Sequence, residues 1–247
     1  MEILKVEDLS FKYPDCGEPA VKNVSFSIER GEFTVLCGAT GSGKSTLLRM
    51  LKPQLTPLGE FSGEICFNGQ SLAGLDAKTS AAAVGFVMQK PEQQIVTDKV
   101  WHELAFGLEN LGVPQETIAA RVAEMANSFG MTEWFSSDVS TLSGGRKQLL
   151  NLASVLVMRP DLLILDEPTA ALDPIAEAEI YAKFDEIVGD KTAIYISHRL
   201  SSCRFCDKIA VFDNGEIVQV GSHEELLADE NGKYYELWTA QAQYYAK

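Results

Sequence analysis

A glycine-rich run between a short apolar strand and a helix constrains this chain more than any other feature. Glycines let a backbone wrap closely around a phosphate, and successive N–H groups with the helix N-terminus stabilise its charge. The run matches the pattern G-x-x-x-x-G-K-[ST] and consists of Gly38, Ala39, Thr40, Gly41, Ser42, Gly43, Lys44, Ser45 and Thr46. In this pattern Lys44 reaches the β- and γ-phosphates of a nucleotide, and the Ser45 hydroxyl is a ligand of Mg²⁺. Because a strand at 33–37 precedes the run and a helix at 45–51 follows it, an incidental glycine turn is a poor alternative.

Two acidic residues after a second apolar strand offer a partner for this loop. The run Leu162–Leu165 has the composition of a fully buried strand, and Asp166 and Glu167 follow it directly. At such a strand end, Asp166 can hold Mg²⁺ through water and Glu167 can accept a proton from an attacking water. Without the glycine-rich loop, two carboxylates here would indicate only a solvated strand end. They indicate a functional site only in combination with that loop.

Strand and helix patterns alternate along most of the chain, which predicts an α/β fold with a mostly parallel central sheet. At the N-terminal end, strands at 3–9, 23–28 and 33–37 are separated only by turns, and we expect them to form an antiparallel β patch. Further along, residues 192–196 have the pattern of a buried strand. Strands at 208–213 and 216–220 flank an Asn-Gly turn and are expected to form a hairpin, before a terminal helix.

Strand patterns are missing between about 91 and 141, where apolar residues recur at helical spacing after Pro114. A further apolar helical face begins at Ser143 and is stopped by Pro160. We therefore predict a single domain over 1–247, with a helical subdomain at about 91–155 inserted in the α/β core.

Composition excludes several kinds of partner. The 21 basic and 35 acidic residues give a net charge of −14, which argues against nucleic acid and against direct docking on anionic lipid. No apolar run approaches the length of a membrane span, and the acidic N-terminal segment is unlike a signal peptide. Five cysteines without a disulfide framework indicate a reduced, cytosolic chain. Cys203-x-x-Cys206 lacks a second ligand pair, so a metal or redox role for it is a minor alternative.

The segment before the helix at Ser143 makes a family resemblance definite. It contains Leu142, Ser143, Gly144, Gly145 and Arg146, which resembles the LSGGQ signature of ABC transporters. The chain resembles the nucleotide-binding subunit of such a transporter over nearly all of its 247 residues. The resemblance implies a P-loop ATPase fold that binds ATP and Mg²⁺ and hydrolyses ATP.

Other motifs of that family occur in the expected order. The resemblance implies that Tyr13 stacks on adenine, that Gln89 touches Mg²⁺ and senses the transport partner, and that Asp173 belongs to a loop crossing the dimer interface. It also implies that His198 contacts the γ-phosphate. Each of these residues would be unremarkable alone.

The resemblance also implies partners and a location. In the family, Ser143, Gly144 and Gly145 face the ATP of a second ATPase subunit, so we expect a homo- or heterodimer with ATP sandwiched between subunits. Transmembrane transporter subunits would hold the chain peripherally on the cytoplasmic face of the membrane.

Arg146 departs from the family, which usually has Gln there. Its cation could strengthen triphosphate contact or merely face solvent.

Two parts of the chain resemble different subfamilies. Residues 1–173, with Gln89-Lys-Pro-Glu-Gln-Gln94 and the Ala-Phe-Gly-Leu-Glu-Asn segment after Glu103, resemble the ATPases of energy-coupling-factor importers, which take up vitamins and metal ions. Residues 174–247 resemble the ATPase ends of ABC exporters. A natural mosaic or an engineered chimera would explain both. We expect an importer ATPase, because the importer-like residues would touch the membrane subunits, and keep an exporter ATPase as the alternative.

Two other functional classes are compatible with the motifs but disfavoured. A DNA-repair or ribosome-associated ABC protein is disfavoured by the acidic charge and the lack of a coiled-coil pattern between Lys44 and Ser143. A binding module without turnover is disfavoured by the intact Glu167 and His198.

In the terminal helix, an aromatic stripe is formed by Tyr234, Trp238 and Tyr245. We expect it to pack on the chain's own sheet, with exposure and self-association as the alternative.

Overall fold

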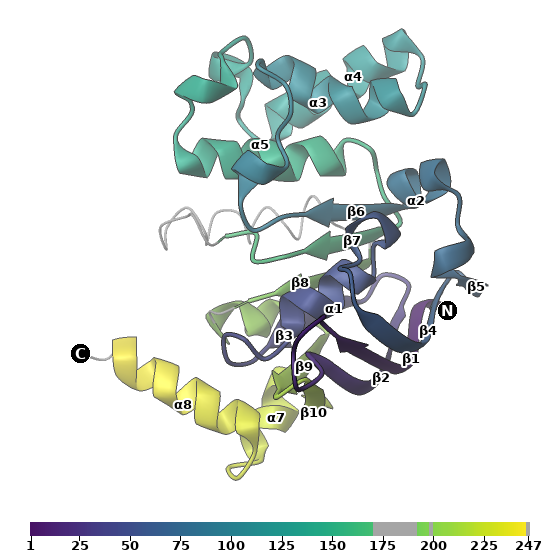
Figure 1. Cartoon of the computed structure of the whole chain (residues 1–247). Coiled ribbons are helices and arrows are strands. Elements are labelled where there is room, and N and C mark those ends of the chain that lie inside the picture. The colour runs from purple at the N-terminus through teal and green to yellow at the C-terminus, as the bar shows by residue number, and fades with distance from the viewer. Residues whose placement is uncertain (170–191, 198–199, 246–247) are drawn as a thin grey trace. The chain divides into compact units, whose positions relative to one another are not determined.

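The described part of the chain, residues 1–169, 192–197 and 200–245 of this computed structural model, is a mixed α/β structure (Figure 1). The chain divides into two compact units, Met1–Ala77 with Val188–Lys247, and Lys78–Ile187. The strands are β1 Glu2–Lys12, β2 Val21–Glu29, β3 Phe33–Cys37, β4 Glu60–Phe67, β5 Gln70–Ser71, β6 Val84–Val87, β7 Leu162–Leu165, β8 Thr192–Ile196, β9 Lys208–Asp213 and β10 Glu216–Gly221. The helices are α1 Lys44–Met50, α2 Ala77–Ala83, α3 Val100–Asn110, α4 Gln115–Ser128, α5 Gly144–Leu156, α7 His223–Ala228 and α8 Lys233–Tyr245.

An antiparallel sheet with strand order β2-β1-β4-β5 lies in the first unit. Strands β1 and β2 are the expected patch, and Leu4 pairs with Ile28 across them. The sequence did not predict β4 or β5. Strand β4 is exposed over its first five residues, so it shows little of the apolar alternation by which a half-buried strand is recognised.

Strand β3 was wrongly predicted to belong to that antiparallel patch. It is parallel to β8, where Phe33 pairs with Ala193, and to β9, where Cys37 pairs with Val211. The reason is burial, because all its residues after Phe33 are buried, and a continuous apolar run is typical of a parallel strand covered on both faces.

The hairpin of β9 and β10 is confirmed. Asn214 and Gly215 have φ of 47° and 88°, as a two-residue turn of this kind requires.

The second unit contains a parallel pair of strands and a group of helices. Val84 of β6 pairs with Leu162 of β7, and α3 packs on both α4 and α5 (Figure 1). These three helices fall within the expected helical region. Pro114 caps α4 as predicted, whereas α5 ends at Leu156, earlier than the stop expected at Pro160. Among the described residues, no helix is long and apolar enough to cross a membrane.

The C-terminal helix α8 packs on α7 and β10 within the first unit. Tyr234 is fully buried, and its ring stacks on that of Trp238 with centroids 6.3 Å apart. The start of the aromatic stripe therefore packs on the chain itself, while the side chain of Tyr245 lies outside the described ones. Helix α7 was not predicted from the sequence, although Ser222 and Glu225 form the capping box that marks such a start.

We expect the half-buried His223 to make folding stability depend on pH. Its Nδ1 lies 2.8 Å from the Tyr234 hydroxyl, and burial and the Arg204 cation lower its pKa from the ordinary 6.5, against a smaller opposing effect of Glu224. The unfolded chain then binds this proton more readily, so stability is present above pH 6.5 and is lost as pH falls through the folded-state pKa.

Thermal melts between pH 8 and pH 5 check this expectation when the chain is compared with its His223→Gln variant. Carboxylates add their own dependence to both proteins, so the measured quantity is the difference between the two curves. The melting temperature of the unsubstituted chain should fall more steeply below about pH 6.5. Parallel curves would contradict the assignment.

Candidate functional site

The glycine-rich run forms a loop after β3. At several positions of this loop, the backbone conformation or a close neighbour allows only glycine. Gly38, Gly41 and Gly43 have φ of 144°, 81° and 108°. A Cβ atom at Gly38 would lie 2.0 Å from the Phe212 carbonyl oxygen, and one at Gly43 would lie 2.1 Å from that of Ala20. A Cβ at Gly41 would meet nothing within 4 Å. The glycines therefore set both the curvature of the loop and its close approach to neighbouring backbone.

The Lys44 side chain is buried within the loop that it follows. Its ammonium donates to the carbonyl oxygens of Gly38 and Ala39 at 3.0 and 2.7 Å, and to the Ser42 hydroxyl at 3.2 Å. All three acceptors belong to the loop itself, two as backbone carbonyls and one as a hydroxyl. Ser45 and Thr46 follow Lys44 in α1.

Tyr13 lies beside the start of α1, as a shared site requires. Its hydroxyl is 3.0 Å from the Thr46 hydroxyl, and its ring meets that of Phe11 edge-on with centroids 4.8 Å apart. Tyr13 also lines a cavity of about 490 Å³ together with the turn at 14–17 and with Gly59 and Glu60. A cavity of this volume lies within the range of small-molecule sites.

The two carboxylates after β7 lie in the second unit and differ in their surroundings. Asp166 is buried, and its backbone N–H donates to the Val87 carbonyl at 2.9 Å. Glu167 is half-buried and has a φ of 51°, in the left-handed region that residues other than glycine rarely occupy. Gln89 donates from Nε2 to the Glu167 carboxylate at 2.6 Å. The structure thus brings together Gln89 and Glu167, which are far apart in the sequence.

Two side chains brace the loop that carries Gln89. Gln94 Oε1 accepts from the Met88 N–H, and its Nε2 donates to the Phe86 carbonyl, both at 2.7 Å. Farther along, the buried Glu103 accepts from the Thr97 N–H at 2.8 Å. The sequence marked Gln94 and Glu103 only as resembling a subfamily. Their contacts show that they hold the backbone on both sides of the loop.

The signature segment begins helix α5. Ser143 is the N-cap residue, and its hydroxyl accepts from the Arg146 N–H at 3.4 Å. Ser143 and Gly144 are exposed. The Arg146 guanidinium lies 5.4 Å from the centroid of the buried Trp134 ring, within the range of a cation–π contact. Arg146 is therefore exposed, as one alternative from the sequence had it, and also packs on its own unit through Trp134.

Asp173 and His198 lie outside the described residues.

Cys203 is buried, and the Cys206 thiol donates to the Cys203 carbonyl at 3.0 Å. Burial raises the pKa of both thiols far above the usual value, so they stay protonated at neutral pH, which disfavours metal binding.

A phosphate-binding loop between β3 and α1, with a carboxylate pair after a second buried strand, defines a P-loop nucleotide-binding protein. The chain belongs to the ABC transporter family, since the family model described as "ABC transporter" matches residues 21–170. It is 37% identical over 229 residues to an energy-coupling factor transporter ATP-binding protein EcfA of Enterococcus faecium, covering 92% of this chain and 81% of the relative. An ABC transporter ATP-binding protein of Bacillus cereus is 43% identical over 91% of this chain. The chain spans only 41% of that relative's length.

Solved structures of two kinds resemble nearly the whole chain. CbiO1 from Clostridium perfringens, described as part of the ABC transporter complex CbiONQ, matches with a TM-score of 0.82 at 32% identity, covering 93% of this chain and 92% of that one. A bacterial Atm1-family ABC exporter with ATP bound matches with a TM-score of 0.84 at 29% identity, covering 98% of this chain and 42% of that one. The P-loop α/β fold of an ABC ATPase is therefore confirmed.

Proposed function

We propose that the chain is the ATP-binding and ATP-hydrolysing subunit that energises an ABC transporter, of the energy-coupling-factor importer type. The observation that carries this proposal is the glycine-rich loop after β3, in which three glycines with positive φ curve the backbone and two of its carbonyls hold the Lys44 ammonium. Phosphate oxygens are stronger acceptors than those carbonyls and can take their place. We further propose that 1–247 acts as one ABC ATPase domain, with the helices at about 91–155 as its subdomain.

The residues fit ATP and Mg²⁺. Gly41 leaves open space beside the loop, and the cavity lined by Tyr13 has the volume of a small-molecule site. Mg²⁺ prefers oxygen ligands, and the candidate donors are the Ser45 hydroxyl, the Asp166 carboxylate and the Gln89 amide oxygen. Bound Mg²⁺ would neutralise charge that develops on the transferred phosphoryl group.

The roles of the remaining residues follow from their chemistry and, for His198 and Asp173, from the family resemblance alone. The backbone from Gly38 to Thr46 cradles the phosphates, and Lys44 pairs with them. Glu167 accepts the proton of the attacking water, and Gln89, which already donates to its carboxylate, orients that carboxylate. His198 would contact the γ-phosphate, and Asp173 would lie at the subunit interface.

A second ATPase subunit would complete the site. The exposed Ser143 and Gly144, with Gly145, present a helix N-terminus that can receive the γ-phosphate held by the other subunit. Transmembrane subunits would then place the chain peripherally on the cytoplasmic face of the membrane. The importer type is supported by the EcfA and CbiO1 resemblances. The exporter resemblance, which covers 98% of the chain, keeps an exporter ATPase as the alternative.

Replacing Tyr13 by alanine is expected to weaken ATP binding by about 1–3 kcal/mol, the usual contribution of an aromatic side chain stacked on a base. Calorimetry should show this loss for ATP and little loss for inorganic triphosphate, which has no base. The Tyr13→Phe variant keeps the ring and loses only the contact with Thr46, so it should bind ATP nearly as well. Equal losses for ATP and triphosphate would rule out stacking.

Two measurements test the proposed function as a whole. Phosphate release from MgATP should be seen for the purified chain and should vanish in the Lys44→Ala variant. Co-purification from membranes, with mass spectrometry of the partners, should yield transmembrane subunits, and their kind would separate importer from exporter. A chain without any MgATP turnover above the Lys44→Ala background would contradict an ATPase.

A further inference from the structure

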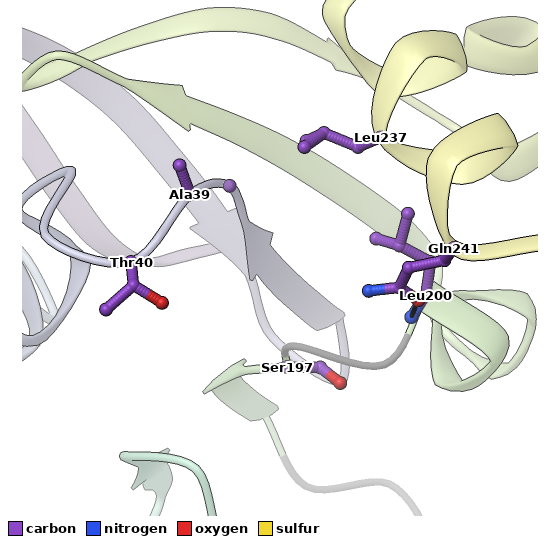
Figure 2. A pocket seen from close by; sticks show the side chains of 7 residues that line it. Ala39, Thr40, Ser197, Leu200, Leu237 and Gln241 are labelled. Carbon is purple, nitrogen blue, oxygen red and sulfur yellow. Dashed lines mark hydrogen bonds between the residues drawn. The ribbon is translucent and has the colours of Figure 1, made fainter. Parts of the chain in front are cut away.

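Two loops of the candidate site have different surroundings. The phosphate-binding loop borders a cavity of about 210 Å³, which Ala39 and Thr40 line together with Leu237 and Gln241 of α8. Figure 2 shows the Leu237 and Gln241 side chains extending from the helix toward the side on which Ala39 lies. The loop that carries Gln89 belongs to the other unit, and side chains of that unit, some of them from α5, contact its backbone.

Helix α5 lies along the loop that follows β6. It packs on β6 and on the short helical turn Pro91–Gln93 within the loop. The Lys147 ammonium of α5 lies 3.9 Å from the Glu92 carboxylate. One turn further along the helix, Asn151 Nδ2 donates to the Met88 carbonyl at 3.5 Å, a hydrogen bond longer than the usual range. The helix therefore contacts the loop at two places.

Asn151 is fully buried, and so is Gln148, its neighbour on the same face of α5. Within the described part of the chain, Asn151 Oδ1 and both polar atoms of Gln148 have no hydrogen-bond partner. A buried amide without partners destabilises a fold, so stability does not explain an asparagine at this place. What its side chain does supply is the hydrogen bond to the Met88 carbonyl.

Met88 connects this support to the proposed catalytic residues. Its N–H donates to Gln94 Oε1 at 2.7 Å, and its carbonyl accepts from Asn151, so Met88 is held on both sides. That carbonyl belongs to the same planar peptide unit as the backbone nitrogen of Gln89. Gln89 Nε2 in turn donates to the Glu167 carboxylate at 2.6 Å. The orientation of this peptide unit therefore determines where the Gln89 side chain begins.

We propose that Asn151 is a positioning residue for ATP hydrolysis, which fixes the peptide unit between Met88 and Gln89 and so aligns the Gln89 amide with the Glu167 carboxylate. The inference rests on the proposed function, because it takes Glu167 as the general base. All the groups involved belong to the second unit and to the described residues. None of the motifs identified in the sequence includes Asn151.

The test compares three replacements on α5 in the full chain. Asn151→Leu and Asn151→Ala both remove the donor, the first with a larger side chain and the second with a smaller one. Both also remove an unpartnered acceptor, so both variants should fold. We expect kcat for MgATP hydrolysis to fall about fivefold, the rate equivalent of one hydrogen bond, while ATP affinity changes less than twofold.

Gln148→Met is the matched control. It replaces an equally buried amide on the same helix face, and that amide makes no hydrogen bond to Met88. Because the Met88 carbonyl keeps its donor in this variant, kcat should stay within about twofold of the unsubstituted chain.

Two further measurements distinguish positioning from a merely structural role. If Asn151 acts through Gln89, the loss of kcat should disappear when Gln89 is already replaced by alanine, because residues that act as a unit do not give additive effects. Hydrogen exchange, which needs no turnover, should be faster at the backbone of residues 88–90 in both Asn151 variants than in Gln148→Met.

An unchanged kcat in both Asn151 variants would overturn the inference. So would a loss that adds in full to that of Gln89→Ala, or an equal loss in Gln148→Met, because the effect would then not pass through the Met88 carbonyl. An unsubstituted chain without turnover above the Lys44→Ala background would instead overturn the proposed function and the catalytic part of this inference. Hydrogen exchange would still decide whether Asn151 fixes the loop.

Discussion

The Lys44→Ala variant is expected to lose about a hundredfold in affinity for MgATP. A hydrogen bond to a charged group contributes about 1.5–3 kcal/mol, and the Lys44 ammonium is expected to contact two phosphates. A loss of about 3 kcal/mol corresponds to roughly two powers of ten in Kd. Isothermal titration of the purified variant measures the loss directly.

Two controls make this result specific. Lys78→Ala removes an exposed lysine outside the loop and should leave the affinity unchanged. Circular dichroism should show the same fold in both variants, because the loop curvature depends on its glycines rather than on Lys44. An ATP affinity in Lys44→Ala equal to that of the unsubstituted chain would exclude the assigned role.

The second large effect is expected from Glu167→Gln. The replacement keeps the size of the side chain but removes its ability to accept a proton, and a positioned general base contributes about 10²–10⁴ in rate. Turnover should therefore fall at least a hundredfold while ATP affinity stays within a few-fold. Phosphate release and titration with ATP give the two quantities.

The neighbouring residue provides the comparison for Glu167. Asp166→Asn should weaken nucleotide binding when Mg²⁺ is present and have little effect without it, because Asp166 is assigned to the metal rather than to the proton. If Glu167→Gln retained half of the wild-type rate, another group would have to be the base.

The conformation of the glycine-rich loop and the position of the carboxylate pair were predictable because their information is local. Three glycines with positive φ and a following lysine are spaced in the sequence as they are needed in the loop. Asp166 and Glu167 follow an apolar strand whose burial is evident from four residues. Neither prediction required knowledge of a distant partner.

Strand pairing was less predictable because it depends on distant segments. β3 was assigned to its nearest neighbours in sequence, yet its partners β8 and β9 come from the C-terminal part of the chain. β4 lacks the alternation that would have revealed it. The missed helix α7 is different, since the Ser222-x-x-Glu225 spacing was available as a local signal.

The side-chain contacts around the candidate site could not be predicted from the sequence either. Arg146 packs on Trp134, and Gln94 bridges Met88 and Phe86, because the fold brings these groups together. A sequence pattern can mark such residues without stating what they touch. The roles of Asp173 and His198 stay predictions, since both lie outside the described residues.

The proposed ATP site requires a sandwiched dimer, because one chain carries only half of each site. The signature residues Ser143 and Gly144 are exposed, as a surface that meets a second subunit must be before assembly. Blocking hydrolysis with Glu167→Gln should preserve the bound nucleotide and so trap the dimer.

Multi-angle light scattering of Glu167→Gln, with and without MgATP, is the most direct test. We expect a monomer without nucleotide and a dimer of twice the mass with MgATP, with no dimer when Ser143 is also replaced by arginine. A Glu167→Gln protein that binds MgATP in titration yet stays monomeric at tens of micromolar would contradict it.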